Sequence, residues 1–351
     1  MSAVLSSIPN TPGVAPHSAG VWAAAAKRFR SDHVGMTSLV IVVLFLLVVL
    51  ASGVGLVAKD WQAEHGVPDA PPTFVGPAPL GESIAAVGPS GPNVDISAVD
   101  PLAPRYKEWA EAAKKYETKE PVKARTLPFG ADRLGRDVLA KAVKGAQVSI
   151  LVGVAAAVVA TLIGTLLGAL AGFFGGKVGD FLEWVYNVFT AMPSILLIFA
   201  FAAVFPRGVS SVVLILGLAG WTGIYRLVRA EFIKHAVRDY VRSAEAIGAT
   251  TASRMFRHIL PNVSHVVLVQ LSIHVVGFIK SEVILSYLGL GVGVDQVSWG
   301  TMLSEAQSEL ILGHWWQLAA ATIFMAVFVT AFSLMTDALR DALDPKLRGL
   351  E

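Results

Sequence analysis

Long apolar runs alternate along this chain with short breaks that carry charged residues, proline or glycine. The first run, residues 39–50, contains only large apolar side chains. A run of about 20 apolar residues is long enough to cross the hydrocarbon core of a bilayer, and backbone groups that lie in lipid must find their partners within a helix. We therefore predict membrane-spanning helices at residues 36–58, 148–173, 181–205, 209–228, 263–285 and 315–337.

Residues 59–146 break this pattern, because proline, glycine and charged residues dominate and no window is long enough to span a membrane. Residues 68–104 have the composition of irregular structure. Residues 102–119 place Trp109, Tyr116 and alanines at helical spacing, which predicts one amphipathic helix. We expect residues 59–146 to form an extracytoplasmic insertion or a small lid.

The apolar pattern also divides the chain into parts. Residues 147–338 form the predicted five-helix core, which contains one long polar loop at residues 229–262. Residues 1–35 and 339–351 are predicted cytoplasmic tails. The polar stretch ahead of the first apolar run is longer than the charged start of a usual signal peptide, so we expect no cleavable signal.

Composition supports a membrane protein, since 54% of the residues are hydrophobic and 15% are charged. A formal net charge of +2 gives no reason to expect a nucleic-acid partner. The sequence contains no cysteine, which excludes disulfides, thiol catalysis and cysteine-ligated metals. The predicted fold class is an all-α polytopic membrane helix bundle with about six transmembrane helices.

The lysines and arginines predict the orientation of these helices. They cluster before the first span, in the 229–262 loop and after the last span. The tight turn between the third and fourth spans has only Arg207, and the turn after the fifth span has no lysine or arginine. By the positive-inside rule, both termini and the 229–262 loop are cytoplasmic.

The 229–262 loop is unusually long for a connection inside a membrane bundle. Its sequence predicts a helix over 232–248 that Gly248 ends, and a second helix over 251–259 that ends at Pro261. One interpretation is a solvated loop that carries the positive-inside charges. The other, which the length favours, is a docking element for a soluble cytoplasmic protein.

The loop resembles the cytoplasmic motif of bacterial ABC-importer permeases, with Ala244, Gly248, Leu260 and Pro261 at matching positions. Further segments, in order and at the right spacing, resemble the C-type subunit of the dipeptide/oligopeptide permease family. The resemblance covers most of the chain outside the N-terminal tail and the insertion. These segments are residues 130–139, 286–291, 298–300 and 337–345.

This resemblance implies a type I ABC-importer permease fold in the bacterial cytoplasmic (inner) membrane. It also implies a companion permease subunit, two cytoplasmic ABC ATPase subunits and an extracytoplasmic substrate-binding protein. The implied cargo is di- or oligopeptides; nickel chelates, glutathione and peptide-like antibiotics, which relatives also move, stay open. The implied ATPase-coupling residues are Tyr240, Arg242, Ser243, Ala244, Glu245, Gly248, Ala249, Leu260 and Pro261.

One departure from the family motif concerns charge. The family usually has glutamate at the start of the motif and often arginine three residues later, whereas this chain has Arg242 and Glu245. The two side chains share one helix face, so an ion pair within the helix is one expectation. The contact with the ATPase then involves an exchanged pattern of charge.

The chain itself is expected to be a non-catalytic subunit without a cofactor, with ATP and Mg bound by partner subunits. Its only Gly-Lys pair, Gly176-Lys177, lacks the upstream glycine of a phosphate-binding loop. A different class, an ATP-independent secondary transporter, would need inverted repeats or membrane-embedded ion-relay carboxylates. The sequence shows neither feature, and the fifth predicted span is the only serious candidate for a relay.

That span contains Lys280 and Glu282, followed by Ser286. A charge inside a membrane is costly, so these side chains should face protein or water. They either line a translocation path or serve a structural role at the outer interface. In the second span, alanines and glycines at four-residue spacing indicate close helix packing, or a sliding surface, and Pro193 predicts a kink in the third span.

Overall fold

The structure is a computed structural model that describes residues 21–77, 100–115 and 123–343. All regular structure in these ranges is helical, and no β-strand occurs in them, which confirms the all-α prediction. Residues 1–20 of the predicted N-terminal tail, residues 78–99 of the insertion and residues 344–351 of the predicted C-terminal tail lie outside the described residues.

The described chain contains four helical segments that are long and apolar enough to cross a membrane. Two further pairs of helices each pass the same test together but are bent, which would bring the number of spans to 6. The prediction of a multi-span membrane bundle is therefore confirmed. The four segments are α2 (His33–Gly53), α4 (Val138–Phe174), Thr251–Tyr287, which ends in α11 (Leu260–Tyr287), and α13 (Trp316–Leu343).

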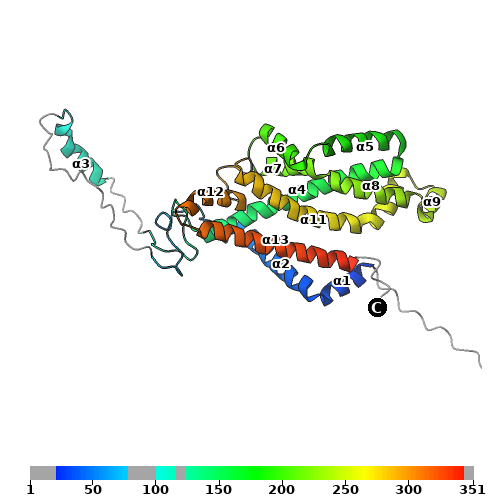
Figure 1. The fold of residues 1–351 in the computed structure, drawn as a ribbon, viewed down its shortest axis with the longest axis horizontal. Helices are drawn as coiled ribbons and strands as arrows, with labels where there is room; N and C mark the ends of the chain where they lie inside the picture. The colour runs from blue at the N-terminus through cyan, green and yellow to red at the C-terminus, as the bar shows by residue number, and fades with distance from the viewer. Residues whose placement is uncertain (1–20, 78–99, 116–122, 344–351) are drawn as a thin grey trace, which may run out of the picture.

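Helix α4 is the central element, since it packs against α2, α7, α8, α11 and α13 (Figure 1). Its 37 residues correspond to about 55 Å, which exceeds the ~30 Å hydrocarbon core. The helix begins at Val138 rather than at the predicted residue 148, and residues 138–146 do not belong to the insertion. The carboxylate of Asp137 caps it by accepting from the Leu139 amide at 2.8 Å.

The prediction of one kinked helix over residues 181–205 is wrong. The structure contains two helices, α5 (Gly176–Thr190) and α6 (Ser194–Val204), whose axes differ by 85°. Pro193 lies directly before α6 and has no amide hydrogen, and its ring disfavours helical geometry at Met192. The proline therefore ends one helix instead of bending it.

The predicted span at residues 209–228 also differs from the structure. Helix α7 (Val209–Gly220) is followed by α8 (Thr222–Ala236) after a 44° bend at Trp221. Helix α8 continues past residue 228 because one of its faces stays buried, with Val228 and Phe232 in the interior. The polar loop is therefore shorter than the predicted 229–262 range.

Within that loop, α9 (Asp239–Ala246) and the short α10 (Thr251–Ser253) flank Gly248. A π-helical segment, η2 (Arg254–Ile259), then joins α10 to α11. The predicted helix end at Pro261 is wrong, because the helix continues through this residue. Pro261 stands in the first turn of α11, where the wider π-helical turn before it accommodates a residue without an amide hydrogen.

The bundle has two distinct ends (Figure 1). Helix α1 (Val21–Ser31), α9 and the C-terminal end of α13 lie at one end, here named the α9 end. Helix α12 (Trp299–Ile311) and residues 123–137 lie at the other, named the α12 end. There, residues 59–77 meet residues 123–137 through isolated bridges such as Gly66 to Ala124.

Within the range 102–119, where one amphipathic helix was predicted, the structure has η1 (Ala103–Arg105) and α3 (Tyr106–Lys115). Residues 116–119 are not described.

Candidate functional site

The segment around Gly248 forms a compact helical hairpin at the α9 end, defined here as residues 238–259. Gly248 has φ of 89°, a left-handed conformation that favours glycine. Its amide donates to the Glu245 carbonyl at 2.9 Å, and the Ala249 amide donates to the Ala244 carbonyl at 2.9 Å. These two bonds form a Schellman motif, which ends α9 and turns the chain toward α10.

An ion pair joins the two arms of the hairpin. Arg254 Nη1 lies 2.6 Å from Glu245 Oε1, so Glu245 pairs across the turn and not with Arg242 inside its own helix. The expected pair between Arg242 and Glu245 is therefore wrong. Arg254 also lies over the ring of Phe173, 5.4 Å from its centroid, which connects the hairpin to the end of α4.

The inner face of the hairpin is apolar and packs into the bundle. Val241 and Ala244 of α9 are buried, and Val241 shares a cluster with Met255 and Ile259 of η2. The same cluster contains Ala169 of α4 together with Ile224, Val228 and Phe232 of α8 and Val263 of α11, and Leu260 packs against it. The hairpin is thus attached to the ends of three membrane-associated helices, so a displacement of α9 must be shared with them.

The outer face of the hairpin combines exposed apolar and cationic side chains. Ile247 at the tip is 85% exposed and Phe256 is 47% exposed, and Val237, directly before the hairpin, is 62% exposed. Arg238, Arg242, Arg257 and Ser243 are exposed beside them. An isoleucine this exposed on a structured turn indicates a contact surface, because single domains rarely leave such groups in clusters on water.

The remaining predicted coupling residues lie on the same hairpin or next to it. The Tyr240 hydroxyl is 2.9 Å from His235 Nδ1, which ties α9 to the end of α8. Burial raises the pKa of Tyr240 above its ordinary value, so this hydroxyl is neutral near pH 7. Ala249 is half-buried in the turn, and Pro261 is exposed on the first turn of α11.

The small-residue stripe of α4 packs directly against α8. A Cβ added at Gly168 would lie 2.7 Å from the Tyr225 carbonyl oxygen, and one at Gly172 would lie 2.5 Å from the Arg229 carbonyl oxygen. One at Gly164 would collide with Ile224. The glycines therefore permit the close approach of two helices that hold the hairpin, which is the packing interpretation of this stripe.

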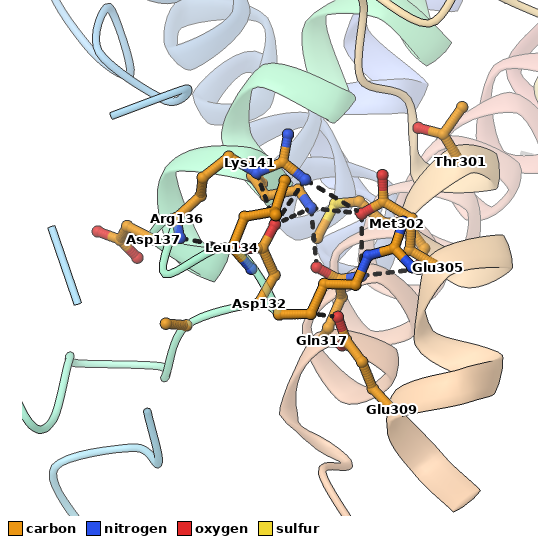
Figure 2. Close-up of polar contacts among 12 residues, drawn as sticks. Asp132, Leu134, Arg136, Asp137, Lys141, Thr301, Met302, Glu305, Glu309 and Gln317 are labelled. Atoms are coloured by element: carbon orange, nitrogen blue, oxygen red, sulfur yellow. Dashed lines mark hydrogen bonds and ion pairs between the residues drawn. The ribbon is translucent and has the colours of Figure 1, made fainter. Parts of the chain in front are cut away.

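A second polar site lies at the α12 end and is centred on the fully buried Lys141 of α4 (Figure 2). Its ammonium donates to Asp132 Oδ2 at 2.7 Å, to Glu305 Oε2 at 2.6 Å and to Gln317 Oε1 at 2.9 Å. These acceptors come from the loop before α4, from α12 and from α13. One side chain thus joins three separate segments.

Asp132 is the second residue with several partners in this site, here named the ion-pair cluster, which consists of Asp132, Arg136, Lys141, Glu305 and Gln317. Arg136 Nη2 lies 2.7 Å from Asp132 Oδ2, and the amides of Leu134 and Arg136 each donate to Oδ1 at 2.9 Å. Burial alone would raise the pKa of the Asp132 carboxyl, but the charge and hydrogen bond of Lys141, with those of Arg136, keep that pKa below its ordinary value.

Two tryptophans and a glutamate complete the α12 end. Trp299 Nε1 donates to the Ala142 carbonyl at 3.1 Å, and Trp316 Nε1 donates to the Ala131 carbonyl at 2.6 Å. Glu309 Oε1 accepts from the Arg133 amide at 3.3 Å, and burial raises the pKa of Glu309. Here the 130–139 segment contacts α12 and α13, and Gly300 of the 298–300 segment packs against Ser286 of the 286–291 segment.

Sequence reasoning missed Lys141, Glu305 and Gln317. Lys141 interrupts an apolar run and therefore reads as the limit of a span, although it is fully buried. Glu305 and Gln317 are 164 and 176 residues away from it, so no local pattern connects them. The one available signal was the charged 132–137 stretch directly before a span.

The predicted path residues separate into two environments. Glu282 is fully buried and accepts from the Ser286 hydroxyl at 2.6 Å, and Ser286 is 2% exposed. Lys280 is exposed and lines a cavity of about 310 Å³ between α11 and α13.

The described residues contain no group of three histidine, aspartate or glutamate side chains placed to hold a metal ion.

Comparison with known proteins identifies a family that this chain matches. Residues 164–349 match the family described as "Binding-protein-dependent transport system inner membrane component". This range begins within α4 and contains the hairpin, α11, α12 and α13.

Curated relatives align with 63% of the chain. The oligopeptide transport system permease protein OppC of Bacillus subtilis is 34% identical over 220 residues, which is 63% of this chain and 72% of that protein. The di/tripeptide transport system permease protein DppC of Pseudomonas aeruginosa is 36% identical over 63% of this chain and 73% of its own length. The glutathione transport system permease protein GsiD of Shigella flexneri is 38% identical with the same two coverages.

Proposed function

The chain belongs to the family of binding-protein-dependent transport system inner membrane components, and from this membership we propose how it is coupled and what it carries. It is a membrane-spanning permease subunit of an ABC importer. It works with ATPase and substrate-binding partners in general. The proposal concerns its orientation, its docking surface, its substrate and the subunits around it.

The hairpin at residues 238–259 docks a cytoplasmic ATPase subunit. The observation that carries this proposal is the pairing of an exposed, apolar and cationic outer face with an inner face packed against α4, α8 and α11. An ATPase that binds Ile247 and the neighbouring arginines differently in its two nucleotide states would move all three helices. Differential contact of this kind is what coupling requires.

The α9 end faces the cytoplasm. Arg238, Arg242 and Arg257 of the hairpin, the cations of α1 and Arg340 of α13 all lie at this end, in agreement with the positive-inside rule. Both chain ends are then cytoplasmic, and the α12 end with residues 59–77 faces outward. The membrane is the bacterial inner membrane, with the extracytoplasmic binding protein on the α12 side.

The substrate is a di- or oligopeptide, which is supported by the names of the Bacillus and Pseudomonas relatives. Glutathione is the second candidate, since the Shigella relative is 38% identical and named for its transport. This chain forms half of the path together with a companion permease. Two ATPases bind ATP and Mg, and this chain needs no cofactor of its own.

The docking proposal is tested by replacing Ile247 with aspartate in the complete transporter reconstituted in vesicles. Burial of an isoleucine stabilises a complex by about 1.5–3 kcal/mol, so we expect ATPase affinity to fall roughly ten- to a hundredfold or more. Peptide uptake driven by ATP should fall with it. ATPase binding is measured by co-purification at graded ATPase concentrations.

Ile311→Asp is the matched control, because Ile311 is 86% exposed at the opposite end of the bundle. It should leave ATPase binding unchanged. Unchanged ATPase binding by the Ile247→Asp chain would remove the docking assignment. Uptake that proceeds without any ATPase would instead support the secondary-transporter class.

A further inference from the structure

A polar seam runs along the facing sides of α11 and α13, outside the sites described so far. Two cavities follow it. The first, here named the central cavity, has about 310 Å³ and is lined by Ser272, Gly277, Lys280, Ser333 and Asp337 among others. The second has about 250 Å³, lies nearer the α9 end and includes His265, Gln270 and Arg340 in its lining.

The residues that line these two cavities share one face of each helix. In α11, His265, Val269, Ser272, Val276 and Lys280 recur at helical spacing, and in α13 residues 333, 336/337 and 340 do the same. Neither Lys280 nor Asp337 lies in the terminal turn of its helix. Charged groups at such depth are costly in contact with lipid, so this seam must face water or protein.

Lys280 and Asp337 line the same cavity but do not neutralise each other. Within the part of the chain that the structure describes, neither side chain has an ion-pair or hydrogen-bond partner. Both are exposed. A fixed cation and a fixed anion in one cavity, without partners, are suited to a ligand that carries both charges.

The rest of the central cavity's lining leaves room for ligands of different shape. A Cβ added at Gly277 would meet no neighbouring atom within 4 Å, so this glycine leaves open space in the cavity wall. Ile273 and Val276 supply apolar wall beside the Ser272 and Ser333 hydroxyls. Such a wall can accept peptide amides through hydroxyls without selecting one side chain.

We infer that the central cavity is a peptide-contacting part of the translocation path in this chain. Lys280 binds the carboxylate of a zwitterionic peptide, and Asp337 binds its ammonium group. The seam continues past Gln270 to Arg340, so the second cavity, whose wall also contains Leu227, Val266, Val269 and Leu343, extends the route toward the α9 end. This inference rests on the proposed function and assigns the path to a face different from that of Glu282 and Ser286.

The first test uses the absence of cysteine from the chain, so that each single-cysteine variant has one thiol on this subunit. Ser333→Cys is placed in the complete transporter in vesicles and treated with a charged methanethiosulfonate reagent. We expect labelling that trialanine suppresses during ATP-driven transport. Thr330→Cys is the matched control, because Thr330 lies one turn earlier on α13 and lines a groove against α2 instead.

The second test alters the cavity itself. Lys280→Gln should lower the rate of trialanine uptake about ten- to a hundredfold, as expected for the loss of one charge-assisted contact, and Lys280→Arg should restore most of it. Gly277→Leu should reduce uptake by filling the cavity, with ATPase binding retained, because the added side chain meets open space.

The outcomes separate this inference from the proposed function. If the wild-type transporter imports trialanine with ATP but peptide does not alter Ser333→Cys labelling, and Lys280→Gln transports normally, the inference is wrong and the proposed function stands. If the wild-type transporter imports no peptide, the proposed substrate is wrong and the inference is wrong with it. A third outcome also overturns the inference. If the companion subunit blocks labelling of Ser333→Cys in the absence of peptide, the seam is a contact surface between the two permease subunits.

Discussion

At the residue scale, the most constrained side chain is Lys141. It is fully buried, and its three acceptors belong to segments that otherwise meet only at the α12 end. A buried ion pair gives little net stability compared with apolar packing, but removal of one partner leaves an uncompensated charge. The main role of Lys141 is therefore to balance the negative charges of Asp132 and Glu305, which both contact its ammonium group.

Lys141→Met tests this view of the ion-pair cluster. The change leaves two carboxylates close to each other with only Arg136 to balance them, so we expect a loss of about 3–5 kcal/mol in stability. Thermal unfolding in detergent measures the loss. Adding Asp132→Asn to Lys141→Met should recover part of it, and a single variant as stable as wild type would contradict the prediction.

Acid should weaken the same cluster. The pKa of Asp132 is lowered in the folded chain, so its contribution to stability is present above the unfolded pKa of about 3.9 and is lost as pH falls through the folded pKa. Between pH 5 and pH 8 this carboxylate contributes a constant amount, because it is ionised in both states throughout that range.

Much of the hairpin could be predicted from the sequence, whereas the ion-pair cluster could not. Gly248 as the end of a helix follows from local chemistry, because only a residue tolerant of positive φ fits there. Glu245 pairs with Arg254 because the turn brings a second helix beside it, which the helical spacing of Arg242 and Glu245 does not reveal. Lys141 was hidden because burial of its charge depends on distant acceptors.

At the element scale, hydropathy locates membrane helices but not their breaks. The 181–205 run is apolar enough to be predicted as one span, yet Pro193 separates α5 from α6 and their axes differ by 85°. The 251–287 stretch contains Pro261, yet remains one continuous helix. The difference lies in the preceding turn, which is π-helical before Pro261 and irregular before Pro193. Tertiary packing decides between these outcomes, and a local sequence window does not contain it.

The contact of α4 with α8 yields a prediction about close packing. Gly168→Leu would place side-chain atoms where the Tyr225 carbonyl oxygen already lies, so we expect a destabilisation of about 1–3 kcal/mol or more. The loss should appear as a lower midpoint of thermal unfolding and weaker retention of the hairpin contacts, seen as faster proteolysis at residues 238–259.

Leu162→Phe serves as the control for that variant. Leu162 lies on the same helix but is 65% exposed, so its enlargement should leave the unfolding midpoint unchanged. Equal midpoints for Gly168→Leu and wild type would show that α4 and α8 can separate at little cost, which is the behaviour of a sliding surface.

At the scale of the whole molecule, the two ends differ in chemistry. The α9 end carries the cationic, exposed hairpin, and the α12 end carries the buried ion-pair cluster and the tryptophan contacts. The bundle therefore has one end with an accessible contact surface and one end that ion pairs and hydrogen bonds hold together. In an importer of this design, a partner would displace the α9 end, and the α12 end would resist distortion.

The proposed orientation predicts opposite labelling of two single-cysteine variants. Ser243→Cys on α9 and Ser308→Cys on α12 are both exposed. A membrane-impermeant maleimide should label Ser243→Cys only in inside-out vesicles and Ser308→Cys only in right-side-out vesicles. The cysteine-free parent chain provides the blank. The reverse pattern would place the hairpin outside the cell and would remove the ATPase from reach.

The π-helical segment Arg254–Ile259 has a consequence for any comparison of this chain with shorter homologues. A wide turn holds one more residue than a regular turn over the same rise, so the segment acts as a phase shift between the hairpin and α11. Loss of a single residue there would rotate everything upstream by about 100° about the α11 axis. Ile247 would then point toward a different quadrant, although every side chain on either side of the deletion stayed the same.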